Sequence, residues 1–212
     1  PITPEQGLVY DAKNLAFILP AGKYIGNSRY KDVFAASAMA DLTSFRNHWG
    51  AETSLDVELY RPVARYELVA KDVATFLNKL STGGLKGESF TARVKYSDYL
   101  PTGYNLWDDV PKNSLMYMEY KVAFERPADG TKELKLGFDY VLTDAGETVS
   151  IPVELEILNE KNEVLARTAF RIPCERGKNT TVRGNFLTSD INGGIGIDPD
   201  YEGDLEVDLG EL

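Results

Sequence analysis

The chain has 212 residues, of which 43% are hydrophobic and 11% aromatic, enough for one large or two small folded domains. Its net charge of −10 excludes a typical nucleic-acid-binding protein, which needs clustered Lys and Arg to meet the phosphates. The single cysteine, Cys174, excludes an intrachain disulfide and, with only one histidine in the chain, a zinc site built from Cys and His.

The first fifty residues contain one clear element. Residues 14–19 (NLAFIL) form a short apolar run typical of a buried strand. Residues 30–49 are rich in helix-forming residues behind a potential cap at Asp32, yet they also fit an extended segment in a loop, and we leave them unassigned. The sequence contains no signal peptide and no apolar run long enough for a transmembrane span.

The stretch from Leu55 to Asp72 alternates between apolar and polar residues, but the alternation shifts midway. Before Arg61 the apolar residues occupy odd positions, and from Pro62 onward they occupy even positions. Because successive side chains of a strand point to opposite faces, this shift moves the buried set to the other face. We therefore predict a bulge here, or a strand that leaves one sheet and joins another, at the seam between two β layers.

A short amphipathic helix is predicted next. Asp72 stands at the N-cap position, four apolar residues follow at helical spacing, and Gly83-Gly84 ends the element. The apolar residues are Val73, Phe76, Leu77 and Leu80.

The rest of the chain consists of short runs with a period of two residues, separated by turn signals, which predicts seven or more strands. The inward-facing residues of these runs are Phe90, Ala92, Val94 and Tyr96; Met116, Met118, Tyr120, Val122 and Phe124; Leu134, Leu136, Phe138, Tyr140 and Leu142; Ile151, Val153, Leu155 and Ile157; Val164, Ala166, Thr168, Phe170 and Ile172; Thr180, Val182 and Phe186; and Leu205, Val207 and Leu209. Residues 97–112 are expected to form the longest loop. The fold class predicted is all-β, a Greek-key sandwich with one short helix and a partial N-terminal β layer.

Several segments resemble the fimbrillin-like surface proteins of gut and oral anaerobic bacteria. They are RPVARYELVAKD at 61–72, YLPTGYNLWDDVP at 99–111, FDYVL at 138–142, IPCERGKNTTVRGNFLTS at 172–189 and GGIGIDPDYEGDLEVDL at 193–209. The resemblance implies an exported lipoprotein with two transthyretin-like sandwich domains. It also implies a place at the cell surface, in the outer membrane or in a fimbrium, and pilus assembly by strand donation between subunits.

On this basis we expect a division of the chain into a partial N-terminal β domain, residues 1–60, and a C-terminal sandwich, residues 61–212. The expected function is non-enzymatic: a cell adhesion protein or a fimbrial subunit or anchor. Its partners would be other surface or pilus subunits. The alternative is a carbohydrate-binding module of a glycan-capture system, whose ligand would be a host or dietary glycan.

Two groups of residues are candidates for ligand binding. Asp198, Asp200, Glu202 and Asp204 alternate as oxygen ligands do in calcium loops, but the match is partial and we favour a solvated acidic turn. Tyr99, Tyr104 and Trp107, with Asp108 beside them, could stack on and hydrogen-bond a sugar, or could instead cover the end of the core. We identify no catalytic residues and no cofactor other than this calcium. Residues 205–209 have the alternation of a donor strand or of a closing edge strand.

Overall fold

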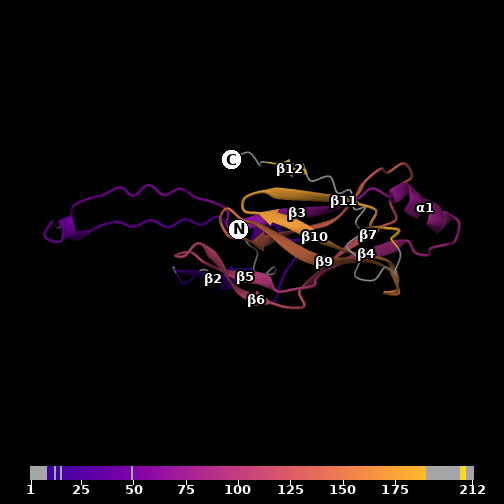
Figure 1. The fold of residues 1–212 in the computed structure, drawn as a ribbon, viewed down its shortest axis with the longest axis horizontal. Helices are drawn as coiled ribbons and strands as arrows, with labels where there is room; N and C mark the ends of the chain where they lie inside the picture. The colour runs from indigo at the N-terminus through magenta and orange to yellow at the C-terminus, as the bar shows by residue number, and fades with distance from the viewer. Residues whose placement is uncertain (1–8, 12, 15, 49, 190–205, 209–212) are drawn as a thin grey trace.

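The computed structural model describes residues 9–11, 13–14, 16–48, 50–189 and 206–208. This part of the chain forms three four-stranded sheets and one α-helix (Figure 1). The strands are β1 (Tyr10–Asp11), β2 (Phe17–Pro20), β3 (Val63–Ala70), β4 (Ser89–Tyr96), β5 (Leu100–Asn105), β6 (Val110–Leu115), β7 (Glu119–Glu125), β8 (Leu134–Leu142), β9 (Thr148–Asn159), β10 (Val164–Glu175), β11 (Asn179–Gly184) and β12 (Glu206–Asp208). The helix is α1 (Val73–Ser81), and the short 3₁₀ turns are η2 (Arg29–Lys31) and η3 (Thr43–Phe45). The predicted all-β sandwich with one short helix is confirmed.

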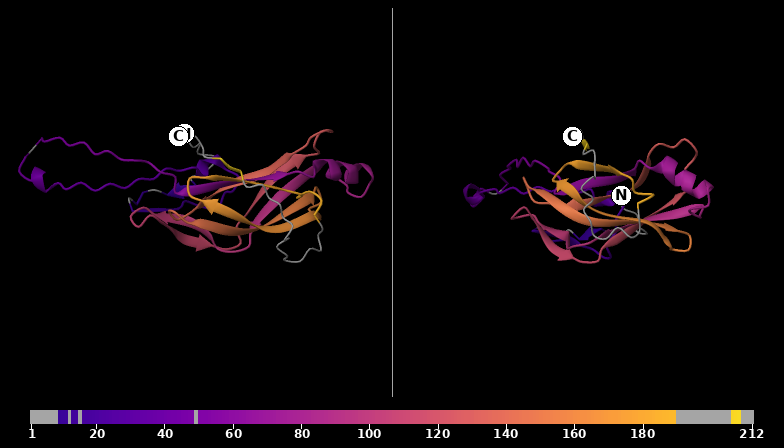
Figure 2. Two further views of the ribbon diagram at one scale, coloured as in Figure 1. Left: turned by 45° about the horizontal axis from the view of Figure 1, so that its top comes forward. Right: turned by 45° about the vertical axis from the view of Figure 1, so that its right-hand side comes forward.

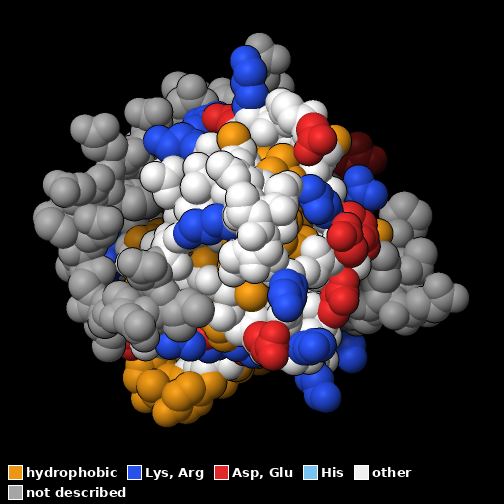
Figure 3. Space-filling view, turned by 90° about the vertical axis from the view of Figure 1, so that its right-hand side faces the viewer, with side chains coloured by type: hydrophobic (Ala, Val, Ile, Leu, Met, Phe, Trp, Pro, Cys, Tyr) orange, Lys and Arg blue, Asp and Glu red, His pale blue; other side chains and the backbone are white. Residues whose placement is uncertain are grey.

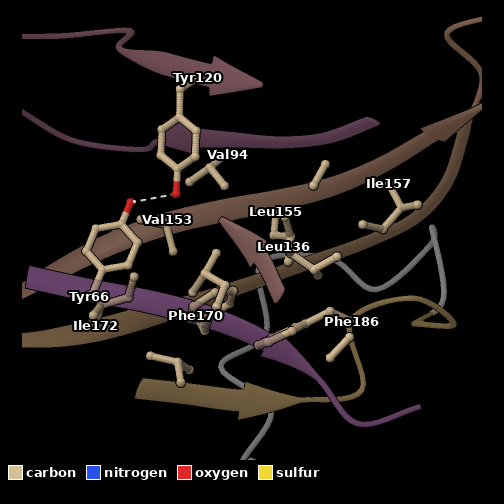
Figure 4. Close-up of a cluster of buried hydrophobic side chains, with 14 of the residues drawn as sticks. Tyr66, Val94, Tyr120, Leu136, Val153, Leu155, Ile157, Phe170, Ile172 and Phe186 are labelled. Carbon is tan, nitrogen blue, oxygen red and sulfur yellow. Dashed lines mark hydrogen bonds between the residues drawn. The ribbon is translucent and has the colours of Figure 1, made fainter. Parts of the chain in front are cut away.

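Two of the sheets enclose the main core. Their strand orders are β10-β9-β4-β7 and β12-β11-β3-β8, with β11 and β3 running parallel. The alternation of β4 is as predicted, since Phe90, Ala92, Val94 and Tyr96 are all buried. Figure 4 shows side chains of β3, β4, β8, β9 and β10 meeting between the sheets. α1 adds Val73, Phe76 and Leu77 to the same core, so the helix closes one end of the sandwich.

A third sheet, ordered β1-β2-β5-β6, builds a second and smaller core against β3 and β8. This core contains the buried residues Ile18, Val63, Tyr104, Tyr140 and Leu142. The prediction that residues 97–112 are a loop is therefore wrong, because they contain β5 and half of β6. Pro101 and Gly103 masked the strand pattern. A proline has no backbone N–H to donate to a neighbouring strand. Pro101 is tolerated in β5 because β2 pairs only with Tyr104 and Asn105, further along that strand.

β8 contributes to both cores, which the sequence pattern did not predict. The pairing of β8 with β3 shifts between Leu68 and Val69, opposite Gly137, whose φ is 150°. Beyond this bulge Val141 faces the main core, whereas Phe138, Tyr140 and Leu142 face the small one. A bulge adds one residue and so exchanges the two faces of the strand. The prediction that all the alternate residues from Leu134 to Leu142 face one core is therefore wrong, because this set is divided between the two cores.

A buried polar network joins the N-terminal segment to the sandwich. The carboxylate of Asp139 is fully buried and accepts hydrogen bonds from Lys31 Nζ at 2.8 Å, from Tyr96 OH at 2.7 Å and from Tyr24 OH. Burial lowers the pKa of Lys31, and its contact with Asp139 acts in the opposite direction. Removing either charged partner would leave the other buried and unpaired, so the network fixes how residues 24–31 sit on β8.

No helix in the described ranges has the length and apolarity needed to cross a bilayer.

Candidate functional site

The most distinctive surface feature is a long projection formed by residues 36–48 and 50–59, which we call the arm. Figures 1 and 2 show it extending away from the sheets as two adjacent legs, on the side opposite α1. At its base, Ala35 and Tyr60 exchange two backbone hydrogen bonds of 2.8 and 2.9 Å. At its tip is η3, and the Asp41 carboxylate just before it accepts a hydrogen bond from Thr43 N. Of the arm residues that the structure describes, only those of η3 belong to a helix or strand.

The arm exposes apolar side chains that have no counterpart to bury them. They are Met39, Leu42, Leu55, Val57 and Leu59, each at least 48% exposed. Single exposed apolar residues are ordinary, but a projecting segment that presents several of them is typical of an interaction site. By contrast, positive and negative side chains are interspersed over the opposite end of the molecule, and hydrophobic ones gather mainly at the lower left of that view (Figure 3).

The leg from Leu55 to Leu59 separates apolar and acidic residues. Leu55, Val57 and Leu59 alternate with Asp56 and Glu58, so an extended backbone places the two kinds on opposite faces. This is the pattern of a strand with one buried face, yet the structure places these residues in solvent. The predicted shift at Arg61-Pro62 therefore marks the passage from the arm into β3. It is not a bulge within one strand, since the pairing irregularity of β3 lies between Leu68 and Val69.

The base of the arm is held by stacked and ion-paired side chains. The Arg176 guanidinium lies 4.0 Å from the centre of the Tyr60 ring and 2.7 Å from an Asp109 carboxylate oxygen. Burial, together with Asp109, raises the pKa of Tyr60 to about 12. Burial alone would raise the pKa of Asp109, but hydrogen bonds from Arg176, Tyr60 and Tyr104 outweigh it and lower that pKa. Next to Tyr60, Arg61 reaches across to the start of the first leg and stacks on Phe34 at 4.5 Å. These contacts fix the direction in which the arm leaves the body.

Tyr104, one of the predicted sugar-binding residues, belongs to this cluster. Its ring is fully buried, and its hydroxyl donates to Asp109 Oδ1 at 2.8 Å. A buried ring offers no face for stacking on a ligand. The structure therefore separates Tyr104 from the three other predicted residues, which are on the surface.

Trp107 and Asp108 lie together in the turn between β5 and β6. Trp107 is 68% exposed, and the Asn105 side chain shapes the turn by accepting hydrogen bonds from the backbone N–H groups of Trp107 and Asp108. Tyr99 is also exposed but precedes β5, whereas Trp107 follows it. Six strand residues at about 3.3 Å each put roughly 20 Å between the two ends of β5. Tyr99 and Trp107 therefore cannot bind one sugar together, and a ligand-binding role for either stays a prediction.

The predicted calcium ligands Asp198, Asp200, Glu202 and Asp204 lie outside the described residues, so calcium binding also stays a prediction. Within the described residues no group of three or more His, Cys, Asp or Glu side chains could hold a metal ion. Of the predicted C-terminal strand, residues 206–208 form β12, which pairs with β11 of the same chain. This pairing favours the closing edge strand over the donor strand.

Sequence reasoning did not predict the arm. Its first leg is rich in helix-forming residues, and its second leg has the alternation of a strand. Neither pattern shows that the part of the chain described by the structure provides no other element to cover the apolar residues. It also missed the aromatic residue Tyr117, which is 85% exposed.

Three solved structures are similar to this chain over part of its length, all of them candidate cell adhesion proteins. The one from Bacteroides ovatus shares 13% identity at a TM-score of 0.34, covering 60% of this chain and 41% of its own. The structure from Parabacteroides distasonis shares 12% sequence identity at a TM-score of 0.35, and the match covers 70% of this chain and 52% of that one. The structure from Bacteroides eggerthii shares 13% sequence identity at a TM-score of 0.30, and the match covers 71% of this chain and 55% of that one. The chain thus spans about half the length of these structures.

No curated protein matches the chain in sequence. A family model, however, matches residues 3–210, nearly the whole chain. The protein therefore belongs to that family, the Family of unknown function (DUF6562).

Proposed function

We propose that this protein is a non-enzymatic adhesion protein or fimbrial subunit of the cell surface, and that it joins other surface subunits through the arm. The observation that carries the proposal is the arm itself: an anchored projection whose exposed apolar residues are not buried within the chain. The resemblance of residues 61–72 and 172–189 to fimbrillin-like proteins supports the same function and implies a lipoprotein of the outer membrane or fimbrium.

Strand addition is the mode of contact that suits the second leg. Residues 55–59 carry unpaired backbone groups and one apolar face, which can complete the edge of a partner's sheet. Asp56 and Glu58 would then lie on the outward face. The partner edge should accordingly present Lys or Arg beside an apolar groove, because opposite charges across neighbouring strands stabilise their pairing.

Photo-crosslinking on the producing cell tests this proposal. A photoreactive amino acid at Val57 is expected to give discrete higher-mass adducts in denaturing gels, because Val57 would lie inside the contact. The same amino acid at Ala145, which is exposed in the β8–β9 connection, serves as the matched control.

A second pair of variants separates burial from charge. Val57→Asp should abolish the adducts formed from a crosslinker at Leu59, whereas Ser54→Asp, which places the same charge on the acidic face, should preserve them. Equal crosslinking from Val57 and Ala145, or adducts that survive Val57→Asp, would contradict the proposal.

Carbohydrate binding is the second candidate function, favoured by the exposed Trp107 ring beside Asp108. An exposed tryptophan next to a carboxylate can stack on a sugar and hydrogen-bond its hydroxyl groups.

A further inference from the structure

A small cleft lies where β4 ends, far along β5 from Trp107. Its volume is about 280 Å³, and its walls come from the last residues of β4, from the segment that leads into β7 and from β9. The lining residues are Lys95, Tyr96, Ser97, Met116, Tyr117, Met118, Glu119 and Glu154. This volume is near the lower limit of about 300 Å³ for small-molecule sites, so the cleft has room for one or two sugar rings.

Tyr117 holds an unusual backbone conformation at the rim of the cleft. Its φ is 61°, in the left-handed region that disfavours most side chains. Five non-glycine residues of the described chain have positive φ, and the four others are Asn or Asp, the types that tolerate this conformation best. Tyr117 is moreover 85% exposed, so burial of its ring does not account for a tyrosine here. A strained, exposed aromatic residue at a cleft suggests a function for its side chain.

The cleft is lined by polar groups in fixed positions. Lys95 Nζ lies 3.0 Å from Glu154 Oε1 and 2.9 Å from Glu156 Oε2, which immobilises the ammonium group. An ammonium has three donors, so one remains for a ligand, and the second oxygen of Glu154 can accept. Glu119 supplies a further carboxylate at the rim. Fixed donors and acceptors next to an aromatic ring are the groups that a polyhydroxylated ligand requires.

We propose that this cleft binds a neutral saccharide, with the Tyr117 ring stacked on one face of a sugar and the Lys95–Glu154 pair hydrogen-bonded to its hydroxyl groups. Met116 and Met118 provide flexible apolar contact to the C–H groups beside the ring. Two carboxylates and one ammonium line the cleft, so acidic sugars are disfavoured. The exposed Tyr99 lies at the same end of β5, because Leu100 pairs with Leu115 just before Met116. The site is separate from the arm and does not depend on its function.

The test is a printed array of neutral and sialylated oligosaccharides, followed by titration calorimetry with the neutral oligosaccharide that gives the strongest signal. Tyr117→Asn is the decisive variant, because Asn removes the ring and relieves the left-handed backbone. It should weaken binding at least about tenfold, the loss typical of a central contact residue, without lowering the melting temperature. Val110→Ala, which removes exposed apolar atoms at the other end of the β5–β6 hairpin, is the control and should bind as the wild type does. Trp107→Ala is measured beside it, because Trp107 is the other candidate sugar contact.

The remaining outcomes overturn the proposal. Absence of signal on every neutral glycan means that the cleft is not a saccharide site. Binding that survives Tyr117→Asn, or is lost only in Trp107→Ala, places the sugar elsewhere. Binding confined to sialylated glycans contradicts the charge argument. The crosslinking of Val57 is unaffected by any of these results, so the failure of either proposal can be recognised separately.

Discussion

Glu156 shows how a single side chain can be charged and yet fully buried. It lies on the outer face of the sheet, in the last third of β9, with no exposed side-chain area. Burial alone would raise its pKa, but hydrogen bonds from Lys95, Arg93 and Arg167 outweigh this effect and hold the pKa at about 2. The three cations come from β4 and β10, so the carboxylate ties the two neighbours of β9 to it.

This arrangement predicts a specific dependence of stability on pH. A carboxylate whose pKa is lowered by folding stabilises the fold above its unfolded pKa, about 4.3, and loses that contribution as the pH falls through the folded pKa. Glu156→Gln should therefore destabilise the protein by about 2 kcal/mol near neutral pH, since it removes the buried carboxylate that three cations share. The difference in melting temperature between wild type and variant should shrink between about pH 4 and about pH 2.

Glu154→Gln is the control for Glu156, because Glu154 contacts Lys95 on the same face but is 29% exposed. Its effect on stability should be smaller, because a partly exposed carboxylate is screened by water. A wild-type advantage over Glu156→Gln that stays constant down to pH 2 would refute the role assigned to the buried carboxylate.

At the scale of elements, local patterns predicted what depends on neighbours in sequence. The helical spacing of Val73, Phe76 and Leu77 gave α1, and the alternation from Phe90 to Tyr96 gave β4. What local patterns missed depends on partners far away in the chain. The bulge at Gly137 is visible only once β8 is paired with β3, and the exposure of Leu55–Leu59 depends on a missing neighbour.

The same distinction holds within the candidate sites. The sequence marked Tyr104 and Trp107 as similar aromatic residues of one loop, but folding buries one of them and exposes the other. Only the hairpin of β5 and β6 decides which ring faces inward, and only the register Leu100–Leu115 brings Tyr99 to the end where Tyr117 lies.

Asp72 illustrates a residue whose position was predicted and whose contacts were not. It occupies the N-cap position of α1, but its side chain makes no capping bond. The carboxylate instead accepts from Leu187 N at 3.0 Å, from Thr188 N at 2.8 Å and from Thr188 Oγ1 at 2.7 Å. It thus attaches the segment after β11 to the start of the helix.

Asp72→Ala should cost about 2–3 kcal/mol of unfolding free energy in urea, because buried N–H groups lose a charged acceptor. Asp41→Ala provides the comparison: Asp41 also accepts from a backbone N–H, at 2.9 Å, but in the exposed tip of the arm. Its loss should cost much less, because water can replace the carboxylate as the acceptor for an exposed N–H group. Equal losses from the two variants would show that the contacts to Leu187 and Thr188 add nothing to stability.

For the whole molecule, the open question is how the N-terminal segment relates to the sandwich. The division of the chain into residues 1–60 and 61–212 stays a prediction. Several contacts cross it, and two of them are buried: Ile18 completes the small core with Tyr104 and Leu142, and Lys31 pairs with Asp139. The arm lies between these contacts and β3, so it can be removed without disturbing either one.

A fragment of residues 61–212 tests this division against a full chain whose arm, residues 36–59, is replaced by a short glycine-containing turn. The shortened chain should melt as the wild type does, because the arm buries little. The fragment should melt roughly 10 °C lower, since Asp139 loses its ammonium partner at a cost of about 3 kcal/mol. Asp139→Asn should then act with opposite sign in the two backgrounds, stabilising the fragment and destabilising the shortened chain. If the fragment melts with the shortened chain and Asp139→Asn harms both equally, residues 61–212 are an independent domain and the buried ion pair does not couple the two parts.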